Sequence, residues 1–169
     1  MASHRKLSRP TDQRMALLRN QVSYLLWNGK LETTYPRAKE VQKLAEKYIT
    51  LAMNTYEDTV KVEKAKFVKG AKSNVEVLND GPKKLAARRI FMSNLYDMQE
   101  TKGDKESRTA YRIRTSDVRH PLIEKIFNEY APKFDKIAKE KGQRGGYTAI
   151  YKIGPRRGDA AEMAIIQIL

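Results

Sequence analysis

Residues 145–169 read GGYTAIYKIGPRRGDAAEMAIIQIL, and this stretch decides the fold. In an extended chain, residues 147, 149, 151 and 153 fall on one face and residues 148, 150 and 152 on the other, which is the two-residue period of a β-strand. A second and more apolar run, AEMAIIQI, follows at 161–168. The intervening GPRRGDA, at 154–160, is rich in Gly and Pro and therefore signals a turn. The stretch predicts a C-terminal β-hairpin, whose hairpin tip we define as residues 155–158.

The first part of the chain predicts two helices joined by one strand. Apolar side chains recur at helical spacing over residues 12–28, with Thr11 as the expected N-cap and Gly29 as the end. Residues 30–34 are long enough for one short strand. A second helix is expected to open near Pro36, because proline is tolerated in a first helical turn.

The middle of the chain is less regular. Residues 54–80 fit two short strands around Gly70, but an irregular loop fits nearly as well. A third helix is expected over about 83–98. Residues 99–119 are poor in aliphatic side chains and mix both charges, which predicts a solvated, partly mobile excursion.

Two further helices are expected before the hairpin. His120 and Pro121 begin the fourth, Pro132 is expected to break it, and a short fifth helix should end at Gly142. The fold class is therefore α+β: a two-layer domain with the order helix, short strand, three or more helices and β-hairpin, the helices packing on a small mixed sheet. Residues 1–10 are expected to form a basic extended arm, and 11–169 a single domain.

The charge is concentrated at the two ends of the chain. The 169 residues hold 34 Lys and Arg against 20 Asp and Glu, a net charge of +14. Residues 1–39 contribute a net +6 and residues 141–158 a net +5, whereas 40–140 contribute only +5 over a much longer stretch. Basic segments with few or no acids predict contact with a polyanion.

Several classes of chemistry lack their residues. The chain has no cysteine and only two histidines, His4 and His120, so thiolate and three-histidine metal sites are excluded. No glycine-rich nucleotide-binding loop occurs. No apolar stretch approaches the ~20 residues of a membrane span, and the N-terminus lacks the apolar core of a secretory signal. We expect a cytoplasmic protein that is not an enzyme and has no cofactor, metal or small-molecule substrate.

The candidate nucleic-acid contacts lie on the arm, along the first helix, at the start of the second helix and around the hairpin. Arginine forks match phosphate geometry, and glycines allow the backbone to approach closely. The candidates are His4, Arg5, Lys6, Arg9, Arg14, Arg19, Arg37, Lys39, Arg144, Lys152, Arg156 and Arg157. Lys43 and Lys47 fit a solvated face and a phosphate contact equally well.

Folded RNA is the expected polyanion, because arms and loops carry the charge rather than one recognition helix. Two other functions remain open at this point. An RNA-processing enzyme would cleave a labelled RNA fragment in the presence of Mg²⁺. A DNA-binding regulator would bind duplex DNA as tightly as structured RNA.

Three blocks resemble one known family. HRKLSRPTDQRMALLRN at 4–20, TTYPRAKEV at 33–41, and the quoted stretch at 145–169 are similar to the bacterial large-subunit ribosomal protein seventeen family. KYITLA at 47–52 and KLAARR at 84–89 also resemble its second and third helices.

This resemblance implies a structural role in the large ribosomal subunit, with direct binding to its large (23S-type) rRNA. It also implies a position towards the exit-tunnel end of the solvent side, beside the subunit's protein thirty-two. Carried over by position, the implied rRNA contacts are Arg5, Lys6, Arg9, Arg37, Lys39, Arg156 and Arg157.

The chain departs from the family pattern in four places. Residues 54–80 and 99–119 look like insertions, and 135–142 looks like a short extension. Ala149 stands where the pattern more often has a basic residue. The mixed charge of the inserts favours contact with solvent and protein over a second major grip on rRNA.

Overall fold

The computed structural model describes residues 5–68, 71–116 and 118–169. Of residues 65–68 and 71–75 it describes the backbone alone. Two hairpins and one single strand are separated along the chain by groups of helices, as in an α+β fold. The elements are α1 (Thr11–Asn28), β1 (Lys30–Thr34), α2 (Tyr35–Met53), β2 (Thr59–Val68), β3 (Ala71–Asp80), α3 (Pro82–Asn94), α4 (Arg108–Thr115), α5 (Pro121–Lys125), the π-helical η1 (Ile126–Tyr130), α6 (Ala131–Lys141), β4 (Thr148–Pro155) and β5 (Glu162–Ile168).

The sheet that carries the C-terminal hairpin has three strands in the order β1-β5-β4. Both of its pairings are antiparallel, with Glu32 opposite Ile165 in one and Ile150 opposite Ile166 in the other. The sheet is therefore antiparallel, and the prediction of a mixed sheet was wrong. The hairpin makes β4 and β5 antiparallel, and β1 then pairs with the free edge of β5 in the same sense.

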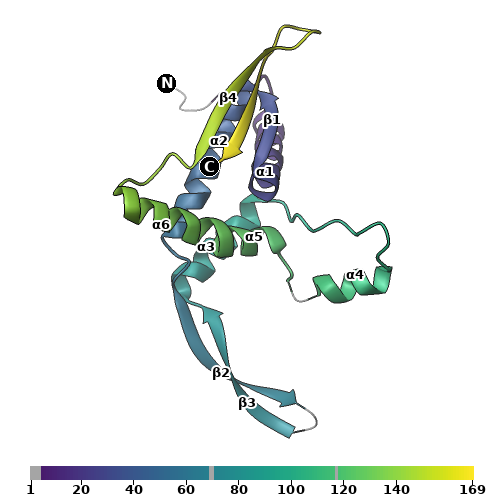
Figure 1. The fold of residues 1–169 in the computed structure, drawn as a ribbon, viewed down its shortest axis with the longest axis vertical. Coiled ribbons are helices and arrows are strands. Elements are labelled where there is room, and N and C mark those ends of the chain that lie inside the picture. The colour runs from purple at the N-terminus through teal and green to yellow at the C-terminus, as the bar shows by residue number, and fades with distance from the viewer. Residues whose placement is uncertain (1–4, 69–70, 117) are drawn as a thin grey trace.

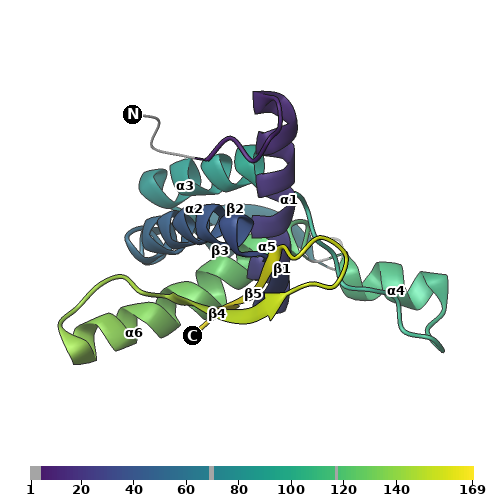
Figure 2. The same ribbon diagram turned by 90° about the horizontal axis from the view of Figure 1, so that it is seen from above.

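Helix α2 lies at the centre of the packed layer. Seen from above, it runs between α3 on one side and the sheet and α6 on the other (Figure 2). Its buried residues include Val41, Ala45 and Ile49, which recur every four residues along one stripe. The aromatic rings of Tyr48 and Phe91 meet edge to face, with their centroids 6.0 Å apart. The core thus joins α1, α2, α3, α5 to α6 and the sheet, which confirms the α+β class.

The ends of α1 correct one prediction and confirm another. Thr11 is the first residue of the helix and not its N-cap, because the Arg14 N–H bonds to the Pro10 carbonyl at 2.9 Å and already closes a turn there. Gly29 ends the helix in the left-handed conformation, with φ 77°. Its N–H donates to the Leu25 carbonyl at 2.8 Å. A residue without Cβ adopts this conformation at little cost, which makes the glycine a C-terminal stop signal.

Residues 59–68 and 71–80 pair as the β2–β3 hairpin, which settles the choice between strands and loop, while the expected turn residue Gly70 lies outside the described residues. Ten residues of each strand pair, from Thr59 opposite Asp80 to Val68 opposite Ala71. This ribbon projects from the end of the molecule opposite the hairpin tip (Figure 1). Asp58 fixes its base, because the carboxylate accepts the Lys83 N–H at 2.7 Å and so satisfies the start of α3.

The helices after residue 119 run on without the expected break. Pro132 lies in the first turn of α6, directly after the π-helical turn η1. The Ala131 N–H reaches back five residues to the Ile126 carbonyl. This wider turn changes the hydrogen-bond register just before Pro132, which has no N–H to donate, so the chain continues as a helix through the proline. The helical segment ends at Gly142, as predicted.

The 99–119 segment is solvent-exposed, as predicted, but it also contains the helix α4, which the sequence prediction missed. Composition gives no sign of this helix, because none of its residues is buried. Its cap is visible in the structure, where the Ser107 hydroxyl accepts the Ala110 N–H at 3.1 Å. In the view of Figure 1, α4 stands out from the side of the body at the end of the long segment that follows α3.

Candidate nucleic-acid interface

The hairpin tip is part of a turn that is closed by the next residue, Asp159. Its carboxylate accepts from Nε and Nη2 of Arg156, at 2.6 and 2.7 Å, and from the Ala161 N–H at 3.2 Å. The backbone closes the same turn, because the Arg156 N–H donates to the Ala161 carbonyl at 3.0 Å. The fork of Arg156 thus serves the turn, and its side chain is exposed to solvent. Asp159 therefore shapes the turn.

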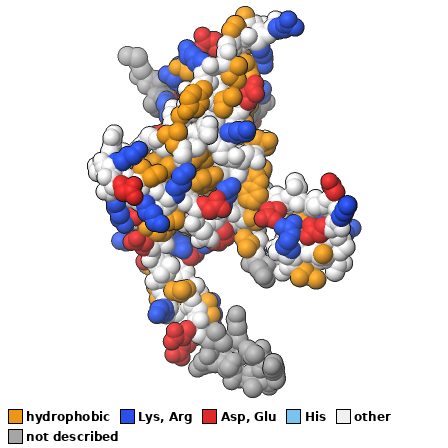
Figure 3. Space-filling model, in the orientation of Figure 1, with side chains coloured by type: hydrophobic (Ala, Val, Ile, Leu, Met, Phe, Trp, Pro, Cys, Tyr) orange, Lys and Arg blue, Asp and Glu red, His pale blue; other side chains and the backbone are white. Residues whose placement is uncertain are grey.

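The charges at the tip remain ionised over a wide pH range. The hydrogen bonds from Arg156 and from the Ala161 N–H lower the pKa of Asp159 to about 2. The same pair raises the pKa of Arg156. Arg157 is exposed, and within the described part of the chain no hydrogen bond or ion pair engages its side chain. The tip therefore presents one free guanidinium beside one that is held in place, and Figure 3 shows Lys and Arg side chains at this end of the molecule.

Two predicted contacts from distant parts of the sequence meet at Tyr35. The Lys152 ammonium from β4 lies 4.5 Å from the centre of the Tyr35 ring, and the Lys39 ammonium from α2 lies 5.1 Å from it. Both distances are within the range of cation–π attraction. Lys152 also lies 3.6 Å from the exposed Glu162 carboxylate. We call Tyr35, Lys39 and Lys152 the tyrosine cluster.

Tyr35 is the site residue that sequence reasoning missed. Its signal was present, because TTYPRAK places an aromatic residue two and four positions before basic ones. Only the fold brings Lys152 to the same ring. Arg37, in the first turn of α2, is half-buried. The start of α2 and strand β4 therefore place two of the candidate lysines at one aromatic ring.

The N-terminal arm is less extended than expected. Leu7 and Ser8 have positive φ values of 56° and 52°, and the Arg9 N–H bonds to the Lys6 carbonyl at 3.3 Å, so the chain makes a turn here. Leu7 packs partly against the core, which holds the turn on the body. Arg5, Lys6 and Arg9 are exposed. His4 lies outside the described residues.

Arg14 and Arg19 occupy different surroundings from the other candidates. Arg14 is only 9% exposed and, with Arg5, lines a cavity of about 270 Å³ between the arm, α1 and α2. Arg19 is half-buried, and its Nε is fully enclosed without a hydrogen-bond partner among the described residues. Both positions offer far less surface to a large ligand than the hairpin tip does.

Arg144 belongs to another part of the surface. Its Nη1 donates to the Asn54 side chain at 3.1 Å, at the end of α2. The charge of Arg144 also helps to lower the pKa of Asp135, although the main cause is the hydrogen bond from Lys139. In Figure 1 the segment that carries Arg144 joins α6 to β4 at the side of the body, far from the hairpin tip. The structure therefore does not bring Arg144 together with Arg156.

The described residues hold no sign of a metal centre. Over residues 5–68, 71–116 and 118–169, no three His, Asp or Glu side chains gather closely enough to bind a metal ion. In the same ranges, every helix is too short or too polar to cross a membrane.

Comparison with known proteins gives a consistent result. The family model described as ribosomal protein L17 matches residues 17–169. The large ribosomal subunit protein bL17 of Acetivibrio thermocellus is 38% identical over an alignment of 194 positions, and that of Lachnospira eligens is 40% identical over 193 positions. The bL17 of Clostridium tetani is 36% identical over 169 residues. All three alignments cover the whole of both chains.

Proposed function

Because the chain belongs to the ribosomal protein L17 family, it is a structural protein of the large ribosomal subunit and not an enzyme, and we propose that it acts there by binding rRNA directly. The contact surfaces are the N-terminal arm, the start of α2 and the hairpin tip. The RNA is the large-subunit (23S-type) rRNA.

The tyrosine cluster is the observation that carries this proposal. It puts a basic residue from each of the two charged ends of the sequence on one aromatic ring, Lys39 from residues 1–39 and Lys152 from residues 141–158. The carboxylate next to Lys152, Glu162, is exposed, so water screens this ion pair. A phosphate that binds at the tyrosine cluster meets both ammoniums and releases condensed counterions, which is the main source of RNA affinity.

The hairpin tip adds a second kind of contact. Asp159 fixes the turn and leaves Arg157 free at its end, so phosphate binding there orders one side chain and not a whole loop. Contacts of this kind position RNA segments relative to the protein by backbone and shape. The chain thereby neutralises phosphates where rRNA segments approach one another.

The other large-subunit proteins are its second class of partner. We propose protein thirty-two as the neighbour, which the family resemblance implies. Its binding would leave the tyrosine cluster and the hairpin tip to the RNA.

The test is the salt dependence of binding. Wild-type protein and the R156A/R157A variant are titrated with large-subunit rRNA from 50 to 300 mM KCl. Loss of two phosphate contacts should reduce the slope of log K against log salt by about 1.4 to 1.8. A matched K61A/K136A variant removes two exposed charges elsewhere and should keep the wild-type slope. An unchanged slope in R156A/R157A would overturn the assignment of the hairpin tip.

A further inference from the structure

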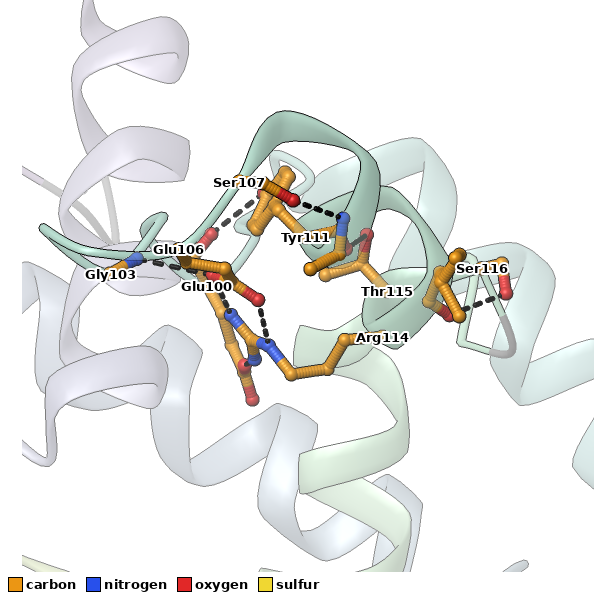
Figure 4. A network of polar contacts seen from close by, with 10 residues as sticks. Glu100, Gly103, Glu106, Ser107, Tyr111, Arg114, Thr115 and Ser116 are labelled. Carbon is orange, nitrogen blue, oxygen red and sulfur yellow. Dashed lines mark hydrogen bonds and ion pairs between the residues drawn. The ribbon is translucent and has the colours of Figure 1, made fainter.

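The segment from Gln99 to Ser116 is folded around Arg114, whose guanidinium is held by two glutamates (Figure 4). Glu106 accepts from Nε at 3.0 Å and from Nη2 at 3.2 Å, and Glu100 accepts from Nη1. Tyr111 closes the ring of contacts, because its hydroxyl donates to the Glu100 carbonyl at 2.9 Å and its ring lies 5.6 Å from the guanidinium. An eight-residue helix is marginal by itself, so this network is what holds α4 in place.

The network sorts the charges of the segment. The sequence from 99 to 119 contains six basic and four acidic residues, which looks nearly balanced. Glu100 and Glu106 are both used by Arg114, on the side of α4 that faces the connecting chain. The hydrogen bond from Arg114 lowers the pKa of Glu106, so this pairing persists in neutral solution. Among the described residues of 99–119, those outside the network include one acid, Asp104, and five Lys or Arg residues.

Two of these basic residues lie together on α4. Arg108 and Arg112 are exposed and one helical turn apart, which places their Cβ atoms about 5–6 Å from each other. In the part of the chain that the structure describes, no carboxylate pairs with either of them. Both side chains are exposed on α4, and none of the described carboxylates neutralises them. They are therefore available to an external anion.

We propose that Arg108 and Arg112 form a second binding site for the phosphate backbone of RNA, separate from the hairpin tip. This inference rests on the proposed function, since it assigns to the same RNA-binding protein a further contact. Guanidinium forks spaced by one helical turn suit successive phosphates better than a single compact anion. An apolar partner is disfavoured, because Ile113 is the only large hydrophobic residue that α4 exposes strongly.

The position of α4 gives this site a distinct role. Figure 1 places α4 at the side of the body and the β4–β5 tip at one end, with the packed helices between them. In Figure 3 the lobe that carries α4 shows both basic and acidic side chains at its surface. Two sites at different places on one chain can engage two RNA segments. The mixed charge of residues 99–119 predicted contact with solvent and protein. In the folded chain Glu100 and Glu106 bind Arg114, which leaves the exposed Arg108 and Arg112 for RNA.

The test compares three variants of the full chain with wild type. R108A/R112A should reduce the salt slope of binding to large-subunit rRNA by about 1.4 to 1.8, with an unchanged far-UV circular dichroism spectrum. K61A/K136A, which removes the same charge elsewhere, should keep the wild-type slope. R108K/R112K, which keeps the charges, should recover most of the lost slope.

The remaining outcomes separate this inference from the proposed function. If R156A/R157A lowers the slope and R108A/R112A does not, the α4 site is overturned and the hairpin tip stands. If R108A/R112A binds rRNA normally but fails to enter large subunits in cells, the occupant is an acidic protein surface and the RNA assignment is overturned. If wild-type protein does not bind the rRNA at all, both proposals fall.

Discussion

Asp159 holds Arg156 by two parallel hydrogen bonds of 2.6 and 2.7 Å, three residues apart on an exposed turn. Such a pair adds little to global stability, because solvent screens it on every side. Its effect is local, since it fixes the path of the chain between β4 and β5. The arginine that sequence reasoning assigned to RNA therefore also builds the platform from which Arg157 projects.

The first prediction concerns the pH at which this turn opens. The pKa of Asp159 is lowered to about 2 from an ordinary value of 3.8, so the pair is complete above about pH 4 and is lost as the pH falls through 2. Carboxyl NMR titration should give a midpoint near 2 for Asp159, with the Ala161 amide moving in parallel. R156A should return the midpoint towards 3.8. A midpoint near 3.8 in the wild-type protein would show that the pair does not exist in solution.

The second prediction separates the ring of the tyrosine cluster from its charges. Y35L removes the cation–π contacts with Lys39 and Lys152 but leaves both ammoniums, so it should weaken rRNA binding by about 0.5–1 kcal/mol, a few-fold, at an unchanged salt slope. K39A should lower the slope by about 0.7–0.9. Filter binding at several salt concentrations measures both. Equal slopes for K39A and wild type would remove Lys39 from the interface.

The third prediction tests the core that positions these surfaces. Phe91 is completely buried between Tyr48 and Phe127, with ring centroids 6.0 and 5.3 Å away. F91A should lower the free energy of unfolding by about 3–5 kcal/mol in urea titrations. The neighbouring Ile90 is 43% exposed, and I90A should change it by no more than about 0.5 kcal/mol. Similar effects of the two variants would contradict the packing of α3 on α2.

The fourth prediction concerns the stop signal of α1. G29A forces a side chain into a backbone with φ 77°, which should cost about 1–2 kcal/mol of unfolding free energy even though a Cβ there meets no other atom within 4 Å. G158A, at a glycine without positive φ and equally open, is the matched control and should be nearly neutral. Thermal unfolding followed by circular dichroism measures the difference. Equal melting temperatures would mean that α1 ends in another way.

The elements that could be predicted from the sequence are those with a local cause. The period of residues 147–168 and the glycine at 29 act through neighbours in the chain, so the hairpin and the end of α1 lie where they were expected. Helix α4 was missed because a network of polar side chains around Arg114 holds it in place. None of its residues is buried, so it has no buried apolar face that a sequence pattern could indicate. The tyrosine cluster depends on a contact between α2 and β4 that only the completed fold makes.

Burial separates the candidate contacts in a way that residue type could not. Arg14 and Arg157 look alike as basic residues, but Arg14 lies against α2 and is nine-tenths buried, whereas Arg157 is exposed at the end of a hairpin. The sequence places Arg14 on the first helix but gives no measure of how far α2 and the N-terminal turn cover it.

Cross-linking within the large ribosomal subunit tests the central claim most directly. Purified subunits that contain this protein are irradiated with ultraviolet light, and the peptides attached to rRNA are identified by mass spectrometry. The account predicts cross-links on the peptides that hold Tyr35 to Lys39 and Arg156 to Arg157. Cross-links confined to other surfaces, such as the exposed side of α6 (Ala131–Lys141), with none at these two places, would contradict it.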